Sequence, residues 1–144
     1  MRLWHKLLIE VLPRQQLLGQ WRELSAIASN INKKGNPNHI LVNKIMDYPI
    51  YHFISYSFYV QAEIYNRGYK TTISTWKNIE SVCAKPYYIL SLDDVYVEWH
   101  NKDYLQICYW NLYEKFLCGG ITEQEWGKIV KQFKKTIDKT EKFW

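Results

Sequence analysis

Apolar side chains recur every three or four residues along most of this 144-residue chain. In the clearest run, which follows Pro13, the apolar residues are Leu17, Leu18, Trp21, Leu24, Ala28 and Ile31. This spacing puts them on one face of an α-helix, and proline suits the first helical turn. We therefore expect a helix that begins at Pro13 and ends at Lys33, Lys34 and Gly35.

Similar spacing predicts further helices over residues 36–46, 47–68, 100–119 and from 122 onward, with a shorter one possible over 71–82. Asp47 is the expected cap of the long central helix, and Thr122 with Glu125 forms a capping box. Val95, Val97 and Trp99 alternate like a strand but have no partner segment, so a loop is expected there. The sequence therefore predicts an all-α fold of about five helices.

The length and charge of the chain restrict its class further. A chain of 144 residues suffices for one core, so residues 1–144 are expected to form a single domain. The net charge of +5 is unevenly placed: residues 1–80 hold ten Lys/Arg and five Asp/Glu, whereas residues 81–144 hold nine of each. An excess confined to the first half indicates a face that meets a polyanion such as a nucleic acid.

Several classes of protein are disfavoured. Cys83, Cys108 and Cys118 cannot all pair internally and lack CxxC spacing, so we expect reduced cytoplasmic thiols packed as small apolar groups. There is no signal peptide pattern and no apolar run of membrane-spanning length. Nucleotide-binding, GxSxG and HExxH motifs are absent, so neither a metal nor an organic cofactor is expected. The four histidines, His5, His39, His52 and His100, are far apart in the sequence.

The helix after Pro13 carries the most informative polar residues. At 100° per residue, Gln16, Gln20 and Glu23 form one polar stripe, and Arg22 lies between this stripe and the apolar face. Glu23 is thus a carboxylate on a rigid element beside a cation. By itself this pattern is more typical of an ordinary solvated helix face.

Three segments together resemble the pyrimidine-dimer DNA glycosylase/AP lyase family. Leu17 to Leu24, read as LLGQWREL, is similar to its aromatic-Arg-Glu-Leu helix, and Arg2 is similar to its near-terminal arginine. Residues 37–41, followed by a helix ending in Arg67-Gly68-Tyr69, resemble its central helix. Residues 111–115, NLYEK, resemble a segment of a late helix. Gln16 and Ala26 depart from the family, which carries a histidine and an arginine there.

The resemblance implies a mechanism in which the N-terminal α-amine attacks the sugar C1′ of a damaged nucleotide, releases the base and cuts the strand by β-elimination. An α-amine has a pKa of about 8, so a useful fraction is unprotonated at neutral pH. Because the bulky Arg2 should block removal of Met1, Met1 is expected to supply this amine. Glu23 would stabilise the developing positive charge and move protons.

The resemblance also implies contacts with damaged double-stranded DNA and an N-terminal segment packed against the helices near the active site. Arg2 and Arg22 are the implied phosphate or lesion contacts. Further phosphate contacts could come from cations that are equally explicable as solvated charges: Lys33, Lys34, Lys44, Arg67 and Lys70. The segment from Arg2 to Arg22 is one residue longer than in the family, which leaves the reach of the amine to Glu23 open.

Three functions are compatible with the sequence. The first is a monomeric glycosylase/AP lyase for UV pyrimidine dimers. The second is a helical DNA-binding module without catalysis, whose binding would depend on salt but not on a free N-terminus. The third is a glycosylase for another modified base, which the departures at Gln16 and Ala26 would permit.

Overall fold

The structure is a computed structural model that describes residues 1–140. Within them the chain forms five α-helices and three short 3₁₀ helices, and no strand. The α-helices are α1 (Arg14–Lys34), α2 (Tyr51–Asn66), α3 (Ile73–Glu80), α4 (Lys102–Leu117) and α5 (Glu123–Thr140). The 3₁₀ helices are η1 (Lys6–Val11), η2 (Asn43–Asp47) and η3 (Leu92–Asp94). The predicted all-α fold is therefore confirmed.

Local signals in the sequence set most helix boundaries. α1 begins directly after Pro13 and ends at Gly35, whose φ of 79° is the left-handed conformation that glycine adopts most easily. Asn101 caps α4 by accepting a hydrogen bond from the Tyr104 N–H. Thr122 and Glu125 form the predicted capping box at the start of α5. These boundaries agree with those expected.

Two expectations for residues 36–50 are wrong. Only η2 is helical there, because side chains compete for the backbone N–H groups: Asn36 Oδ1 accepts from Asn38, and Asn43 Oδ1 accepts from His39. Asp47 caps no helix, since the next residue is extended and α2 begins only at Tyr51. The loop expected around residues 95–99 is confirmed.

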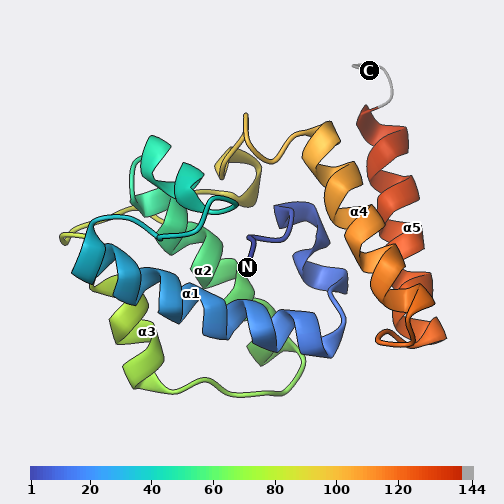
Figure 1. The fold of residues 1–144 in the computed structure, drawn as a ribbon, viewed down its shortest axis with the longest axis horizontal. Coiled ribbons are helices and arrows are strands. Elements are labelled where there is room, and N and C mark those ends of the chain that lie inside the picture. Colours follow the sequence, from blue (N-terminus) through green and yellow to red (C-terminus); the bar gives the residue numbers. More distant parts are fainter. Residues whose placement is uncertain (141–144) are drawn as a thin grey trace.

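The helices form two groups joined by the N-terminal segment (Figure 1). α1 packs against α2 and α3, while α4 and α5 pack against each other. η1 contacts both α2 and α5 and so lies between the groups. The α4–α5 contact is aromatic, with the Tyr109 and Phe133 rings stacked at 3.9 Å between centroids.

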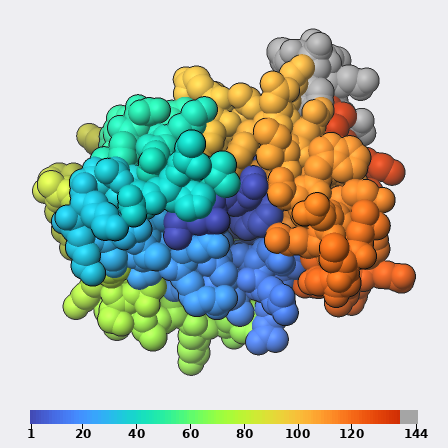
Figure 2. Space-filling view, in the orientation of Figure 1, coloured from blue at the N-terminus to red at the C-terminus, as the bar shows by residue number. Residues whose placement is uncertain are grey.

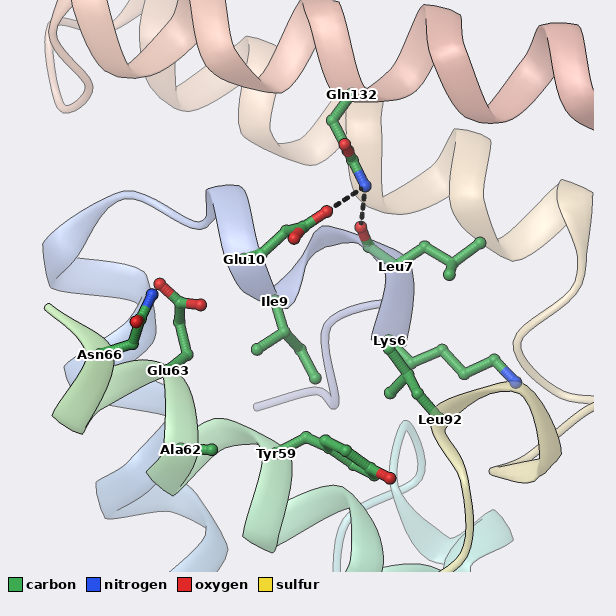
Figure 3. A pocket seen from close by; sticks show the side chains of 10 residues that line it. All are labelled: Lys6, Leu7, Ile9, Glu10, Tyr59, Ala62, Glu63, Asn66, Leu92 and Gln132. Atoms are coloured by element: carbon green, nitrogen blue, oxygen red, sulfur yellow. Dashed lines mark hydrogen bonds between the residues drawn. The ribbon is translucent and has the colours of Figure 1, made fainter.

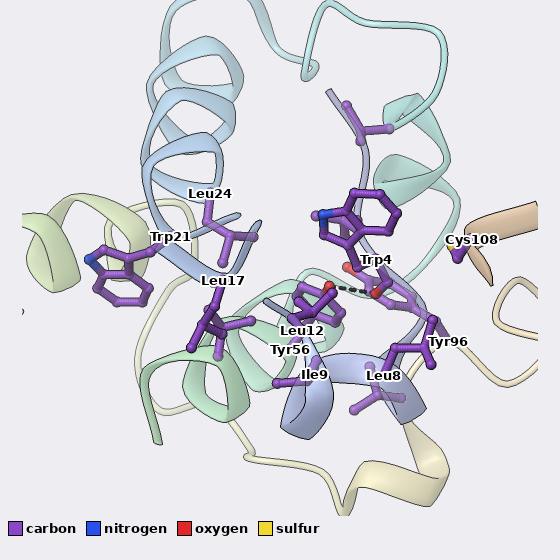
Figure 4. Packing of buried hydrophobic residues seen from close by; sticks show 14 of the residues in the cluster. Trp4, Leu8, Ile9, Leu12, Leu17, Trp21, Leu24, Tyr56, Tyr96 and Cys108 are labelled. Carbon is purple, nitrogen blue, oxygen red and sulfur yellow. Dashed lines mark hydrogen bonds between the residues drawn. The ribbon is translucent and has the colours of Figure 1, made fainter. Parts of the chain in front are cut away.

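The N-terminal segment is part of the hydrophobic core (Figure 4). Leu3, Leu8 and Leu12 are fully buried and pack with core residues of α1 and α2 such as Leu17 and Tyr56. The expectation that this segment packs against the helices is confirmed, because most of its apolar side chains are buried in the core.

The cysteines and the helix surfaces complete the description. All three cysteines are free, but only Cys108 is buried; Cys118 is exposed, so the expectation that all three pack inside is wrong. Cys118 follows the last residue of α4, where the chain turns at the surface. No helix within residues 1–140 is both long and apolar enough to cross a membrane.

Candidate active site

The first residues of the chain lie against the middle of α1. The Arg2 backbone N–H donates a hydrogen bond to Glu23 Oε2 at 3.3 Å. Because one extended residue spans at most about 3.6 Å, the α-amine of Met1 lies within about 7 Å of this carboxylate. Met1 itself is 38% exposed, and Glu23 is half-buried. The longer segment between Arg2 and Arg22 therefore still brings the terminus close to Glu23.

Gln20, on α1, binds the backbone of Arg2 and Trp4 and so holds the N-terminal residues against this helix. Its side chain is 1% exposed, its Nε2 donates to the Arg2 carbonyl at 2.9 Å, and its Oε1 accepts from the Trp4 N–H at 2.8 Å. The Tyr56 hydroxyl oxygen lies 3.0 Å from the same Oε1. A buried amide with two bonds to the main chain holds the backbone of residues 2–4 in one register on α1.

Two tyrosines hold the same backbone from other helices. The Tyr56 hydroxyl, on α2, lies 2.6 Å from the Trp4 carbonyl, and the Tyr104 hydroxyl, on α4, donates to the Leu3 carbonyl at 2.5 Å. Burial raises the pKa of both hydroxyls, so both stay protonated and can donate. Three helices thus bind the main chain that leads to Met1.

A buried histidine pair anchors the segment one step further on. The His5 and His100 rings are 5.1 Å apart, His5 Nε2 donates to the His100 carbonyl, and His100 Nδ1 accepts from the Lys6 N–H. Burial lowers the pKa of His5 to about 4 and that of His100 well below its usual range, so both are neutral. The Lys6 ammonium donates to the Asp93 and Val95 carbonyls.

Two arginines lie close to the terminus. Arg2 is half-buried, with its guanidinium 5.4 Å from the Trp4 ring centroid and its charge near Tyr104 and Cys108. Arg22 is exposed, next to Glu23 on α1. Glu23, Arg2 and the α-amine therefore lie close together, and Arg22 is the residue before Glu23 on α1.

The remaining predicted DNA contacts are distributed along the molecule. Lys33 and Lys34 are exposed at the end of α1, and Lys44 is exposed on η2. Arg67 is half-buried, pairs with Glu63 at 2.8 Å and donates to the Leu12 and Glu10 carbonyls. The structure does not bring Arg67 to Glu23.

Lys70 is exposed at the opposite end of α1 from Lys33. Its neighbour Tyr69 contacts Arg14 at the start of this helix, with the guanidinium 5.2 Å from the ring centroid. At 1.5 Å per residue, Arg14 and Lys33 are separated by about 30 Å. Glu23 lies roughly midway between these two ends.

A separate pocket of about 390 Å³ lies between η1, α2 and α5 (Figure 3). Its lining includes Lys6, Glu10, Tyr59 and Glu63, but neither Met1 nor Glu23. Glu10 Oε1 accepts from Gln132 Nε2 at 2.8 Å, a bond between η1 and α5 that joins two residues of the pocket lining. This pocket is therefore distinct from the site around the terminus.

Two features of the site are not predicted by the sequence analysis. Gln20 is expected on the polar stripe, but its side chain is buried. It is three residues after Leu17 and four before Leu24, a spacing that indicates an inward side chain. The pairing of His5 with His100 spans 95 residues, and nothing local in the sequence indicates it. Within residues 1–140, no three His, Cys, Asp or Glu side chains are grouped to hold a metal ion.

Comparison with known proteins identifies the family. Residues 1–77 match the family model described as pyrimidine dimer DNA glycosylase, which is just over half of the chain. The match contains the N-terminal segment, α1 and α2, whereas the resemblance noted at residues 111–115 lies outside it. No curated protein and no solved structure matches the chain. On this match, the chain belongs to the pyrimidine dimer DNA glycosylase family.

Proposed function

We propose that this protein is a DNA glycosylase with coupled AP lyase activity, and that it removes UV pyrimidine dimers from duplex DNA with the α-amine of Met1 as nucleophile. The observation that supports this most directly is the 3.3 Å hydrogen bond from the Arg2 N–H to Glu23 Oε2. It supports the proposal because it leaves the α-amine of Met1 within about 7 Å of a carboxylate that a helix holds in place.

The chemistry follows from these two groups. The amine lone pair forms a bond to C1′ while the glycosidic C1′–N bond breaks, and the base leaves with its electron pair and takes up a proton. The sugar ring then opens to an imine, loss of a C2′ proton expels the 3′ phosphate, and water releases the amine. Glu23 is suited to stabilise positive charge at C1′ and to carry the protons.

Arg2 and Arg22 are proposed to bind the phosphates that flank the lesion, since they border Glu23. Lys33, Lys34, Lys44 and Lys70 are proposed as outer phosphate contacts on a monomer acting in the cytoplasm without a cofactor. Arg67 stays a weaker candidate, because its guanidinium already has three partners within the protein.

The test is borohydride trapping of tag-free protein on two duplexes, one with an abasic site and one with a cyclobutane thymine dimer. Mass spectrometry should locate a covalent adduct at Met1 with both. A protein extended by a few residues ahead of Met1 is the control, because it displaces the amine, and it should lose the adduct.

The other two functions correspond to other outcomes. Trapping on the abasic duplex alone would support a glycosylase for a different modified base. Salt-dependent duplex binding without an adduct on either substrate would replace the proposed enzyme with a non-catalytic DNA-binding module.

A further inference from the structure

The segment between α1 and α2 presents three apolar side chains to solvent. Ile40 is 85% exposed, Leu41 48% and Met46 44%, and we refer to these three residues as the apolar tip. The neighbouring Val42 and Ile45 are fully buried. Leaving an isoleucine almost wholly in water forgoes the free energy of burying it, so its position has no explanation in the packing of this chain.

Hydrogen bonds hold the turn that carries the apolar tip in one conformation. The Val42 and Asn43 N–H groups both donate to the His39 carbonyl, at 3.0 and 2.9 Å. The Leu41 N–H donates to His39 Nδ1 at 3.2 Å, and Asn30 on α1 donates to the Pro37 carbonyl at 3.0 Å. A turn with these bonds and two buried anchors holds its exposed side chains in place, which lowers the entropy lost on binding.

The charge around the apolar tip fits a polyanion. Residues 24–46 contain three lysines and no Asp or Glu. All three of these lysines, Lys33, Lys34 and Lys44, are exposed. Asp47, next to Met46, is the nearest acidic residue in the sequence. Apolar side chains with lysines before and after them in the sequence match duplex DNA, which has phosphates outside and a stack of apolar base faces within.

The location of the segment links it to the proposed reaction. In Figures 1 and 2 the segment after α1, coloured cyan to teal, lies on the same face as the dark blue N-terminal residues and borders them. On the other side of these residues Figure 2 shows the orange surface of the α4 region. A duplex positioned for Met1 and Glu23 would therefore also meet the segment that carries the apolar tip.

We propose that the apolar tip is a wedge that enters the base stack of the duplex next to the lesion. Insertion of apolar side chains unstacks a base step and kinks DNA, at a cost of a few kcal/mol that is smaller where the pair is already damaged. The wedge would hold open the path by which the α-amine of Met1 reaches C1′. This inference rests on the proposed function and adds how the duplex is opened.

The test compares wild-type protein with an Ile40→Ser/Leu41→Ser variant on the same abasic site in duplex and in single-stranded DNA. A single strand needs no wedge, so the variant should trap it within about twofold of the wild-type rate and trap the duplex at least tenfold more slowly. Ile73→Ser is the matched control, since Ile73 is a 73% exposed isoleucine at the start of α3. It should leave both rates unchanged.

A second measurement does not depend on catalysis. With 2-aminopurine beside a non-reactive tetrahydrofuran abasic site, wild-type protein should raise the fluorescence by unstacking the base, and the double variant should not. If wild-type protein traps neither substrate, the proposed function fails, but this fluorescence still decides whether the wedge exists.

Three results would overturn the wedge. They are equal duplex rates for wild type and variant, an equal loss on duplex and single strand, and an unchanged fluorescence response in the variant. Binding to anionic phosphatidylserine vesicles that is lost in the double variant, together with unchanged duplex trapping, would assign the apolar tip to a membrane surface.

Discussion

Residues 1–80 and residues 81–140 contribute differently to the same site. The first region contains the whole family match, Met1, Glu23 and the excess of positive charge. The second contributes Tyr104 to the Leu3 carbonyl, His100 to the Lys6 N–H and Gln132 to the Leu7 carbonyl, at 2.5, 2.9 and 3.0 Å. Its charge is balanced, and its two long helices pack through aromatic rings.

The difference suggests a division of work. In the proposed reaction the first region supplies the reacting groups and, through Gln20 and Tyr56, hydrogen bonds to the backbone of residues 2–4. The second region contributes hydrogen bonds to residues 3–7 from farther along the chain. Removing a reacting group should change chemistry alone, and removing a hydrogen bond of the second region should change stability first.

The largest effect is expected for Glu23→Gln. The amide keeps the size of the side chain but loses the charge and the proton-accepting function, so base release should fall by about a thousandfold. Duplex binding, measured by fluorescence anisotropy, should be nearly unchanged. Glu114→Gln on α4 is the control, since Glu114 is exposed in the second region. Full activity in Glu23→Gln would remove Glu23 from the mechanism.

The stability of the contact between the two regions, where His5 binds the His100 carbonyl, should decrease in acid. Because burial lowers the pKa of His5 from 6.5 to about 4, the unfolded chain takes up a proton at a higher pH than the folded one. The stabilisation is complete above pH 6.5 and is lost as the pH falls toward 4. At about 1.4 kcal/mol per unit of pKa shift, His5 alone contributes about 3 kcal/mol to the free energy of unfolding that is lost in acid.

Urea unfolding between pH 7.5 and 4 measures this dependence. His5→Asn is the informative variant, because asparagine can still cap η1 but does not titrate. The variant should show a flatter decline than wild type. An identical decline in both proteins would mean that His5 does not govern the acid response.

A smaller loss of kcat is expected for Gln20→Leu in the first region, and little loss for Gln132→Leu in the second. Gln20→Leu leaves the Trp4 N–H and the Arg2 carbonyl without their side-chain partner, which should cost about 2 kcal/mol of stability. It should also lower kcat by about tenfold to a hundredfold with little change in KM, because the amine is no longer held beside Glu23.

Gln132→Leu is the comparison. It breaks two bonds between α5 and η1, so it should lower the melting temperature while kcat stays within about threefold of wild type. Equal losses of kcat in both variants would show that the two regions do not divide the work.

What could be predicted from the sequence was whatever depends on near neighbours. Periodicity and caps located α1, α4 and α5, and the position of Glu23 beside Arg22 follows from helix geometry alone. Residues 36–46 were mispredicted as helical, because their spacing matches a helix while the Asn and His side chains satisfy the backbone in another way.

What could not be predicted depends on packing between distant segments. The inward role of Gln20 requires residues 2–4 to lie on α1, 16 to 18 positions away. The neutral His5–His100 pair requires the end of the α3–α4 connection to reach the N-terminal segment. Neither contact is indicated by the spacing of residues in the sequence.

The packing of η1 on α5 also has a consequence for how the protein is made. A ribosome adds about 5 to 20 residues per second, so residues 1–12 wait for several seconds before Gln132 exists to bind the Leu7 carbonyl. Until then the peptide that leads to Met1 lacks several of its native partners and stays accessible to enzymes that process nascent chains. Residues 1–12 are thus made before α5 but obtain their full set of contacts only after it.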